Sequence, residues 1–107
     1  MAQESSSYQI EDLLKTAANQ DGRYYRFIDN EKLTSGIYEL KVGDEDLQNP
    51  HEWDELYYVL EGEATLQAGG ESYDAVPGAI LFVAADVDHK FVNINQDLKI
   101  LVFFSKK

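Results

Sequence analysis

From residue 24 to residue 104 the sequence is a succession of short apolar runs separated by turn signals, and this recurrence limits the fold more than any other feature. The runs are rich in β-branched and aromatic residues, which favour strands. Glu61-Gly62 and Gly69-Gly70 predict tight hairpins, and Pro77-Gly78 indicates a turn. We expect strands over residues 24–28, 35–42, 56–60, 64–68, 71–76, 79–83, 90–94 and 98–104. Strands at such regular intervals predict a β-barrel or a β-sandwich.

The segment before these strands has a different period. Ile10, Leu13, Leu14 and Ala17 recur at the three-to-four spacing of one helical face, which predicts a short amphipathic helix over residues 8–19. A chain of 107 residues has room for one core. We therefore expect an N-terminal segment, residues 1–22, that carries the helix, followed by one β-domain over residues 23–107.

Composition argues against several kinds of partner. Twenty acidic against nine basic side chains give a formal charge of -11, which repels nucleic-acid phosphates and anionic lipid surfaces. No apolar run approaches the roughly 18 residues that span a bilayer, and the polar start MAQESSS has no secretory signal pattern, so we expect a cytoplasmic protein. Because the chain has no cysteine, any metal must be bound by nitrogen and oxygen atoms.

Two of the expected strands are apolar at consecutive positions instead of alternating ones. Residues 56–60 read Leu-Tyr-Tyr-Val-Leu and residues 100–104 read Ile-Leu-Val-Phe-Phe, so both faces of each strand must be covered. A second layer of the same barrel would cover the outer face, and so would the partner subunit of a symmetric homodimer. We expect a homodimer, with burial within the chain as the competing account.

The chain has two histidines, at positions 51 and 89. His51 and Glu55 project to the same face of an extended segment because an even number of positions separates them. An inward-facing glutamate is costly unless its charge is compensated, and a divalent cation is the simplest compensator. Two imidazoles and one carboxylate form an open-sided set of metal ligands. The alternatives are solvated loop histidines and a glutamate paired with a lysine.

Two sequence motifs surround these residues. The first, Gly43-x5-Asn49-x-His51-x3-Glu55-x6-Gly62, resembles the first cupin motif with asparagine in place of its first histidine. The second, Gly78-x5-Ala84-x-Asp86-x2-His89-x3-Asn93, is similar to the second cupin motif, with Ala84 replacing a proline and Asp86 a turn glycine. The chain therefore resembles the small single-domain cupins, of cupin type 2 in the RmlC-like jelly-roll superfamily.

The resemblance implies an all-β double-stranded β-helix, or jelly-roll barrel, of about eight strands with the short N-terminal helix packed outside. It also implies one divalent metal ion, with iron, manganese, zinc and nickel not distinguished, on His51, Glu55 and His89. Asn49 occupies the fourth ligand position of the family. An amide oxygen is a weaker ligand than imidazole, so we expect lower affinity or a water in its place, with Gln48 as a substitute. A metal-free binding pocket is the alternative.

The pocket and the activity follow from the same resemblance. Trp53, Tyr57 and Phe91 share the expected inward face, so they either line a pocket beside the metal or simply fill the core. The family implies a metal-dependent enzyme of dioxygenase, isomerase or decarboxylase type that acts on a small organic molecule. The alternative is a non-catalytic cupin that binds or senses a small molecule, with or without metal.

Overall fold

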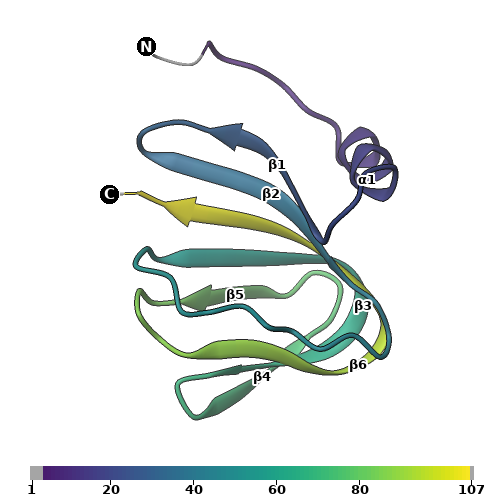
Figure 1. Cartoon of the computed structure of the whole chain (residues 1–107), viewed down its shortest axis with the longest axis vertical. Helices are drawn as coiled ribbons and strands as arrows, with labels where there is room; N and C mark the ends of the chain where they lie inside the picture. The colour runs from purple at the N-terminus through teal and green to yellow at the C-terminus, as the bar shows by residue number, and fades with distance from the viewer. Residues whose placement is uncertain (1–3, 107) are drawn as a thin grey trace.

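The computed structural model describes residues 4–106 and consists of one short helix and one antiparallel sheet (Figure 1). The elements are α1 (Ile10–Ala18), β1 (Tyr24–Asp29), β2 (Leu33–Leu40), β3 (Glu55–Ala68), β4 (Glu71–Ala75), β5 (Ile80–Val83) and β6 (His89–Ser105). The sheet has the strand order β1-β2-β6-β3-β4, and β5 pairs with β3. The predicted all-β fold with a short N-terminal helix is confirmed. Within the described range, no helix has the length and hydropathy needed to cross a membrane.

The central strands β3 and β6 are longer than predicted. The expected hairpin at Glu61-Gly62 is wrong, because β3 continues through it and pairs with β6 along nearly its whole length. Gly62 has φ 96, and a Cβ atom there would lie 2.2 Å from the carbonyl oxygen of Asp97 on β6. The register shifts on both sides of this position, so the glycine marks a β-bulge where the ribbon bends. The predicted strands 56–60 and 64–68 are thus both part of β3, and the predicted strands 90–94 and 98–104 are both part of β6.

The main core lies inside the curved sheet. Burial alternates along the first half of β3, so that Glu55, Tyr57 and Val59 face inward. Ile100 and Val102 of β6 share the same interior and are also fully buried. The side chain of Glu55, at the start of β3, is therefore a charged group in a row of buried apolar side chains.

Helix α1 packs on the outer face of its own sheet, beside β1 and β2 (Figure 1). Leu13 and Ala17 are buried against Ile37 of β2, and Leu60 and Leu101 are partly buried in the same cluster. Helix α1 of the same chain therefore covers part of the outer face of the two wholly apolar segments, at Leu60 and Leu101. The other part, near the beginning of β3, remains open on its outer face.

Candidate metal centre

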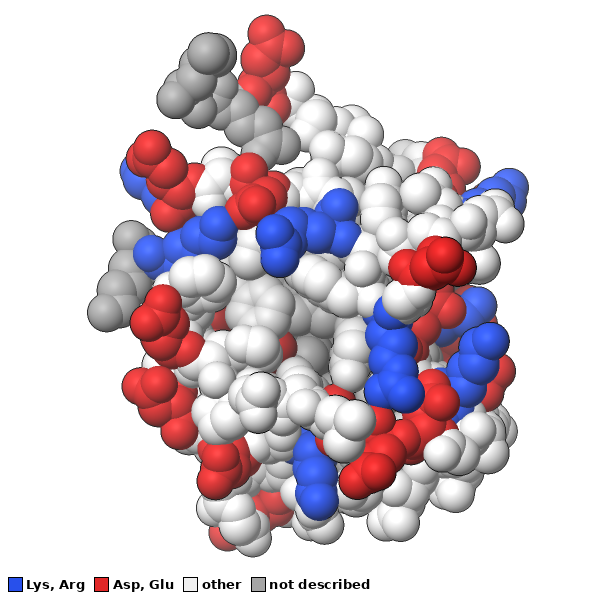
Figure 2. All heavy atoms as spheres, viewed as in Figure 1, with Lys and Arg blue, Asp and Glu red and all other residues white. Residues whose placement is uncertain are grey.

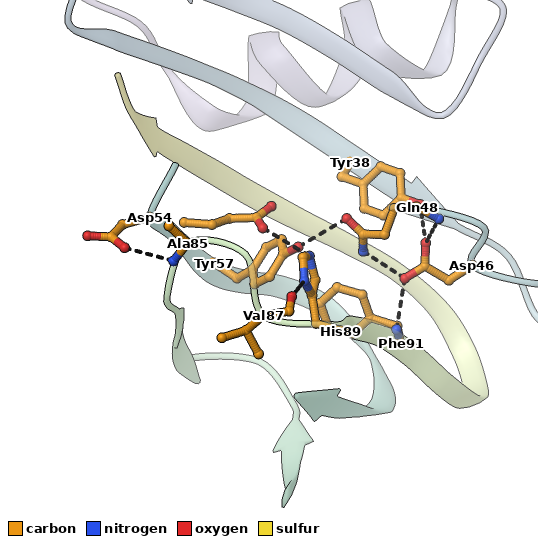
Figure 3. Close-up of polar contacts among 10 residues, drawn as sticks. Tyr38, Asp46, Gln48, Asp54, Tyr57, Ala85, Val87, His89 and Phe91 are labelled. Carbon is orange, nitrogen blue, oxygen red and sulfur yellow. Dashed lines mark hydrogen bonds and ion pairs between the residues drawn. The ribbon is translucent and has the colours of Figure 1, made fainter. Parts of the chain in front are cut away.

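Two segments that are far apart in the sequence meet at the site, and short backbone contacts hold them together. The Asp86 amide donates a hydrogen bond to the His51 carbonyl oxygen at 2.7 Å. The Ala85 amide donates to the Asp54 carboxylate at 2.9 Å (Figure 3). Asp86 has φ 64, a left-handed conformation that aspartate adopts more readily than most residues. It therefore provides the turn that a glycine gives at this position of the motif.

These contacts bring His51, Glu55 and His89 together. One ligand atom from each lies within 4.8 Å of the other two, so the three side chains form a group that could hold a metal ion. Glu55 begins β3 and His89 begins β6, and both are buried, whereas the half-buried His51 lies in the segment before β3. The rings of His51 and His89 have centroids 5.7 Å apart.

The orientation of His89 is fixed by the backbone. Its Nδ1 lies 2.8 Å from the carbonyl oxygen of Val87, an acceptor, so Nδ1 carries the proton and donates it (Figure 3). Nε2 then directs its lone pair at Oε1 of Glu55, which is 3.0 Å away. Both atoms are buried, and neither makes a hydrogen bond of good geometry within residues 4–106. Two acceptors this close repel unless a proton or a cation lies between them.

The pKa of His89 reflects this contact. Burial alone would lower it, but the Glu55 carboxylate and the Val87 carbonyl favour the protonated ring and raise the pKa above its usual value. In the absence of a metal, a proton on Nε2 thus satisfies the pair. A divalent cation would replace that proton, because metal ligands must be deprotonated.

A cavity of about 280 Å³ opens beside His51 and Glu55. Trp53 and Tyr57 line it, together with Val102 and Phe104 of β6. Phe91 lies behind this wall, with its ring centroid 5.0 Å from that of Tyr57, and is not among the residues that line the cavity. Figure 2 shows a hollow in this face of the molecule, walled mainly by uncharged side chains.

A buried hydrogen-bond network supports the cavity wall. Asp46 is 6% exposed. It accepts hydrogen bonds from the backbone amide of Phe91, the hydroxyl of Tyr38 and the side-chain amide of Gln48, all between 2.7 and 2.8 Å (Figure 3). Gln48 in turn accepts from the Tyr57 hydroxyl at 3.3 Å. Sequence analysis missed Asp46, because a single aspartate in a polar loop is indistinguishable from a solvated one.

Asn49, at the fourth ligand position of the family, and its neighbour Gln48 lie in different surroundings. Asn49 is exposed and lines a second groove, which also reaches His89. Gln48 lines both that groove and the cavity, and its amide group is already engaged by Asp46 and Tyr57. Of these two residues, only Gln48 lines the cavity that His51 and Glu55 also line.

Comparison with known proteins establishes the family. Residues 36–104 match the model of the cupin domain family, Cupin_2, so the chain belongs to the cupins. The resemblance inferred from the two motifs and the jelly-roll fold are confirmed. An uncharacterised protein of Streptomyces coelicolor, SCO3923, is 36% identical over 99 residues, which cover 92% of this chain and 94% of the relative.

Solved structures show the same fold. An RmlC-like cupin from Shewanella frigidimarina superposes with a TM-score of 0.71 and 24% identity, over 78% of this chain and 75% of the other. The iron(II) form of HppE in complex with its substrate superposes with a TM-score of 0.64 and 21% identity, over 76% of this chain and 52% of the other. At these identities the similarity concerns the fold alone.

Proposed function

We propose that this cupin binds one divalent metal ion through His51, Glu55 and His89 and acts as a metal-dependent enzyme on a small organic molecule in the adjacent cavity. The carrying observation is the buried pair formed by His89 Nε2 and Glu55 Oε1, which face each other at 3.0 Å and need a proton or a cation between them. A cation between them would satisfy both atoms, and His51 lies within reach as a third ligand.

The surrounding residues suit this role. Val87 holds His89 in the tautomer that presents Nε2 as a ligand, which is how protein carbonyls commonly orient metal-binding imidazoles. The rings of Trp53 and Phe104 shield one side of the cavity from water, with His51 packed edge-on against Phe104 at 4.9 Å. A divalent ion bound here would supply Lewis acidity and open coordination positions, since three protein ligands do not complete its shell.

The fold is compatible with such a centre, because the structural neighbour HppE carries iron(II) on it. Dioxygenase, isomerase and decarboxylase reactions remain the candidate activities. A protein that binds or senses a small molecule without turnover is the competing possibility. Apart from His51 and Glu55, the described cavity lining contains no histidine, aspartate, glutamate or lysine that could serve as a general base, which is the specific observation in its favour.

Elemental analysis of the protein purified without added metal tests the metal centre. We expect stoichiometric metal in the unchanged protein and a loss of more than about 100-fold in affinity for His51→Ala and for His89→Ala. Glu52→Ala is the matched control for Glu55→Ala, because Glu52 is exposed and lies three positions away. A full metal content in any of the three ligand variants would remove that residue from the centre.

Oxygen consumption and product formation during a screen of small organic molecules separate the two functions. An enzyme consumes the substrate in repeated turnovers that cease when the metal is removed by chelation. A binding protein shifts its thermal stability with the same compound but leaves it chemically unchanged. Turnover that persists in the metal-depleted protein would contradict the proposal.

A further inference from the structure

We propose that the molecule bound in the cavity is a small monocarboxylic acid with an apolar body, whose carboxylate is recognised by Arg26 and Tyr24, which line the cavity from β1. This inference rests on the proposed function insofar as it places a substrate in the same cavity. It adds the chemical class of that substrate, and it is tested by a measurement that does not require the metal.

The charges at the cavity are the first reason. Besides His51 and Glu55, which belong to the candidate metal centre, Arg26 is the one residue of the described cavity lining with an ionisable basic or acidic side chain other than a tyrosine. Arg26 contacts Asp29 at 3.2 Å, but Asp29 is shared with Lys106 at 2.5 Å. Lys106 also lies 5.5 Å above the ring of Trp53, which lines the cavity. Two cations thus share one carboxylate, and the rim keeps a positive charge.

This positive rim is unusual for the molecule, whose formal charge is -11. In Figure 2, basic side chains lie above the hollow, whereas acidic side chains predominate around much of the remaining outline. A local charge of opposite sign to the whole molecule attracts an anion to one place while other anions are repelled elsewhere. The single excess charge suits a monoanion better than a doubly charged phosphate.

An available hydrogen-bond donor is the second and independent reason. Three tyrosines line the cavity, and two of their hydroxyl groups are engaged, Tyr38 with Asp46 and Tyr57 with Gln48. The hydroxyl oxygen of Tyr24 is fully buried and makes no hydrogen bond of good geometry among residues 4–106, although the side chains of Thr34 and Arg26 lie close enough to interact with it. Burial raises the pKa of Tyr24, only partly offset by Thr34 and Arg26, so the phenol keeps its proton and can donate it.

Arg26 and Tyr24 are placed as one unit. They are two positions apart on β1 and therefore project from the same face, and the guanidinium carbon lies 5.8 Å from the centroid of the Tyr24 ring. Gly36 on β2 makes room for that ring, because a Cβ atom there would lie 2.4 Å from Cε1 of Tyr24. A guanidinium and a phenol on one wall offer a carboxylate a charged donor and a neutral one.

The remaining walls define the rest of the molecule. Trp53, Phe104 and Val102 are apolar, and the volume of about 280 Å³ lies at the small end of the range for ligand sites. A ligand that places its carboxylate at Arg26 therefore has a short hydrocarbon or aromatic body. Its far end would reach toward His51 and Glu55, where the chemistry of the proposed function takes place.

Phenylacetate and its neutral analogue phenylacetamide are suitable probes, with the fluorescence of Trp53, the only tryptophan, as the signal. We expect phenylacetate to bind about tenfold more tightly, as one charge-assisted hydrogen bond allows. Arg26→Gln should abolish this preference. Arg23→Gln is the matched control, because Arg23 contacts Asp44 and Glu45 and does not line the cavity, and it should keep the preference. Tyr24→Phe should weaken both probes severalfold.

Several results would overturn the inference. They are equal binding of the two probes, no binding of either, an unchanged preference in Arg26→Gln, or tighter binding of phenyl phosphate than of phenylacetate. Circular dichroism and thermal unfolding of each variant verify that the fold is retained. The metal content of the same samples is measured separately. If the protein prefers phenylacetate but contains no metal, the carboxylate site is supported and the metal centre is contradicted. If it contains metal but shows no such preference, the metal centre is supported and the carboxylate site is contradicted.

Discussion

At the start of β3, the inner face buries a charged side chain and the outer face exposes apolar ones. On the inner face Glu55 is 3% exposed, whereas on the outer face the neighbouring Leu56 and Tyr58 are 37% and 40% exposed. Burying a carboxylate and exposing apolar area both cost free energy. The two faces of this segment therefore depart in different ways from an arrangement that favours the stability of a monomer without ligands.

The outer face forms one continuous strip with β5. Leu56 pairs with Phe82 and Tyr58 with Ile80, and the two residues of β5 are 62% and 66% exposed. In the described sheet β5 pairs with β3 alone, so its other edge is open. Open apolar edges are prone to association. The homodimer expected from the sequence stays a prediction, and this strip is the part of the outer face that α1 does not cover.

The largest effect is expected on the inner face. Replacing both Glu55 and His89 by leucine removes the two facing polar atoms, and it should abolish metal binding while raising the free energy of unfolding of the metal-free protein by about 1–4 kcal/mol. Chemical denaturation compares the two proteins. His89→Leu alone is the control and should be destabilising, because it leaves Glu55 buried without its neighbour. A double variant that is less stable than the parent would show that the inner face is built for stability after all.

A somewhat smaller effect is expected on the outer face. Phe82→Asp places a charge in the exposed strip, and it should weaken self-association by at least about 30-fold, the loss of one central interface residue. Sedimentation velocity over a range of concentrations measures it. Tyr73→Asp on β4 is the control, since Tyr73 is also an exposed aromatic residue, at 47%, but lies outside the strip. A parent protein that stays monomeric at every concentration would rule out the homodimer.

The smallest effect concerns pH. The pKa of His89 is raised above its usual 6.5, so in the metal-free protein its protonated form contributes stability that is fully present below about pH 6.5 and is lost as pH rises through the raised pKa. The melting temperature should fall by roughly 5 °C over that interval. Glu55→Gln should flatten the dependence. In the metal-loaded protein the sign reverses, because protons compete with the metal for His89, and stability that rises with acidification there would contradict the ligand role.

The sequence was a good guide where local rules decide the outcome. The spacing of His51 and Glu55 placed both on one face, and the resemblance to the two cupin motifs implied His89 as their partner, a group that the structure brings within 4.8 Å. Strand positions were also predicted to within a few residues. The hairpin at Glu61-Gly62 was wrong because a positive-φ glycine serves equally well in a turn and in a bulge, and only the partner strand distinguishes them.

What the sequence determined by itself is the pattern: alternating apolar residues for a barrel, an amphipathic helix, and two motifs with metal-ligating side chains at fixed intervals. These depend on the periodicity of strands and helices, which is local. The tertiary structure alone decided that Val87 orients His89, that Asp46 supports the cavity wall, and that the buried hydroxyl of Tyr24 lies beside Arg26. Each of these depends on atoms from distant segments approaching within hydrogen-bond distance, which no local period encodes.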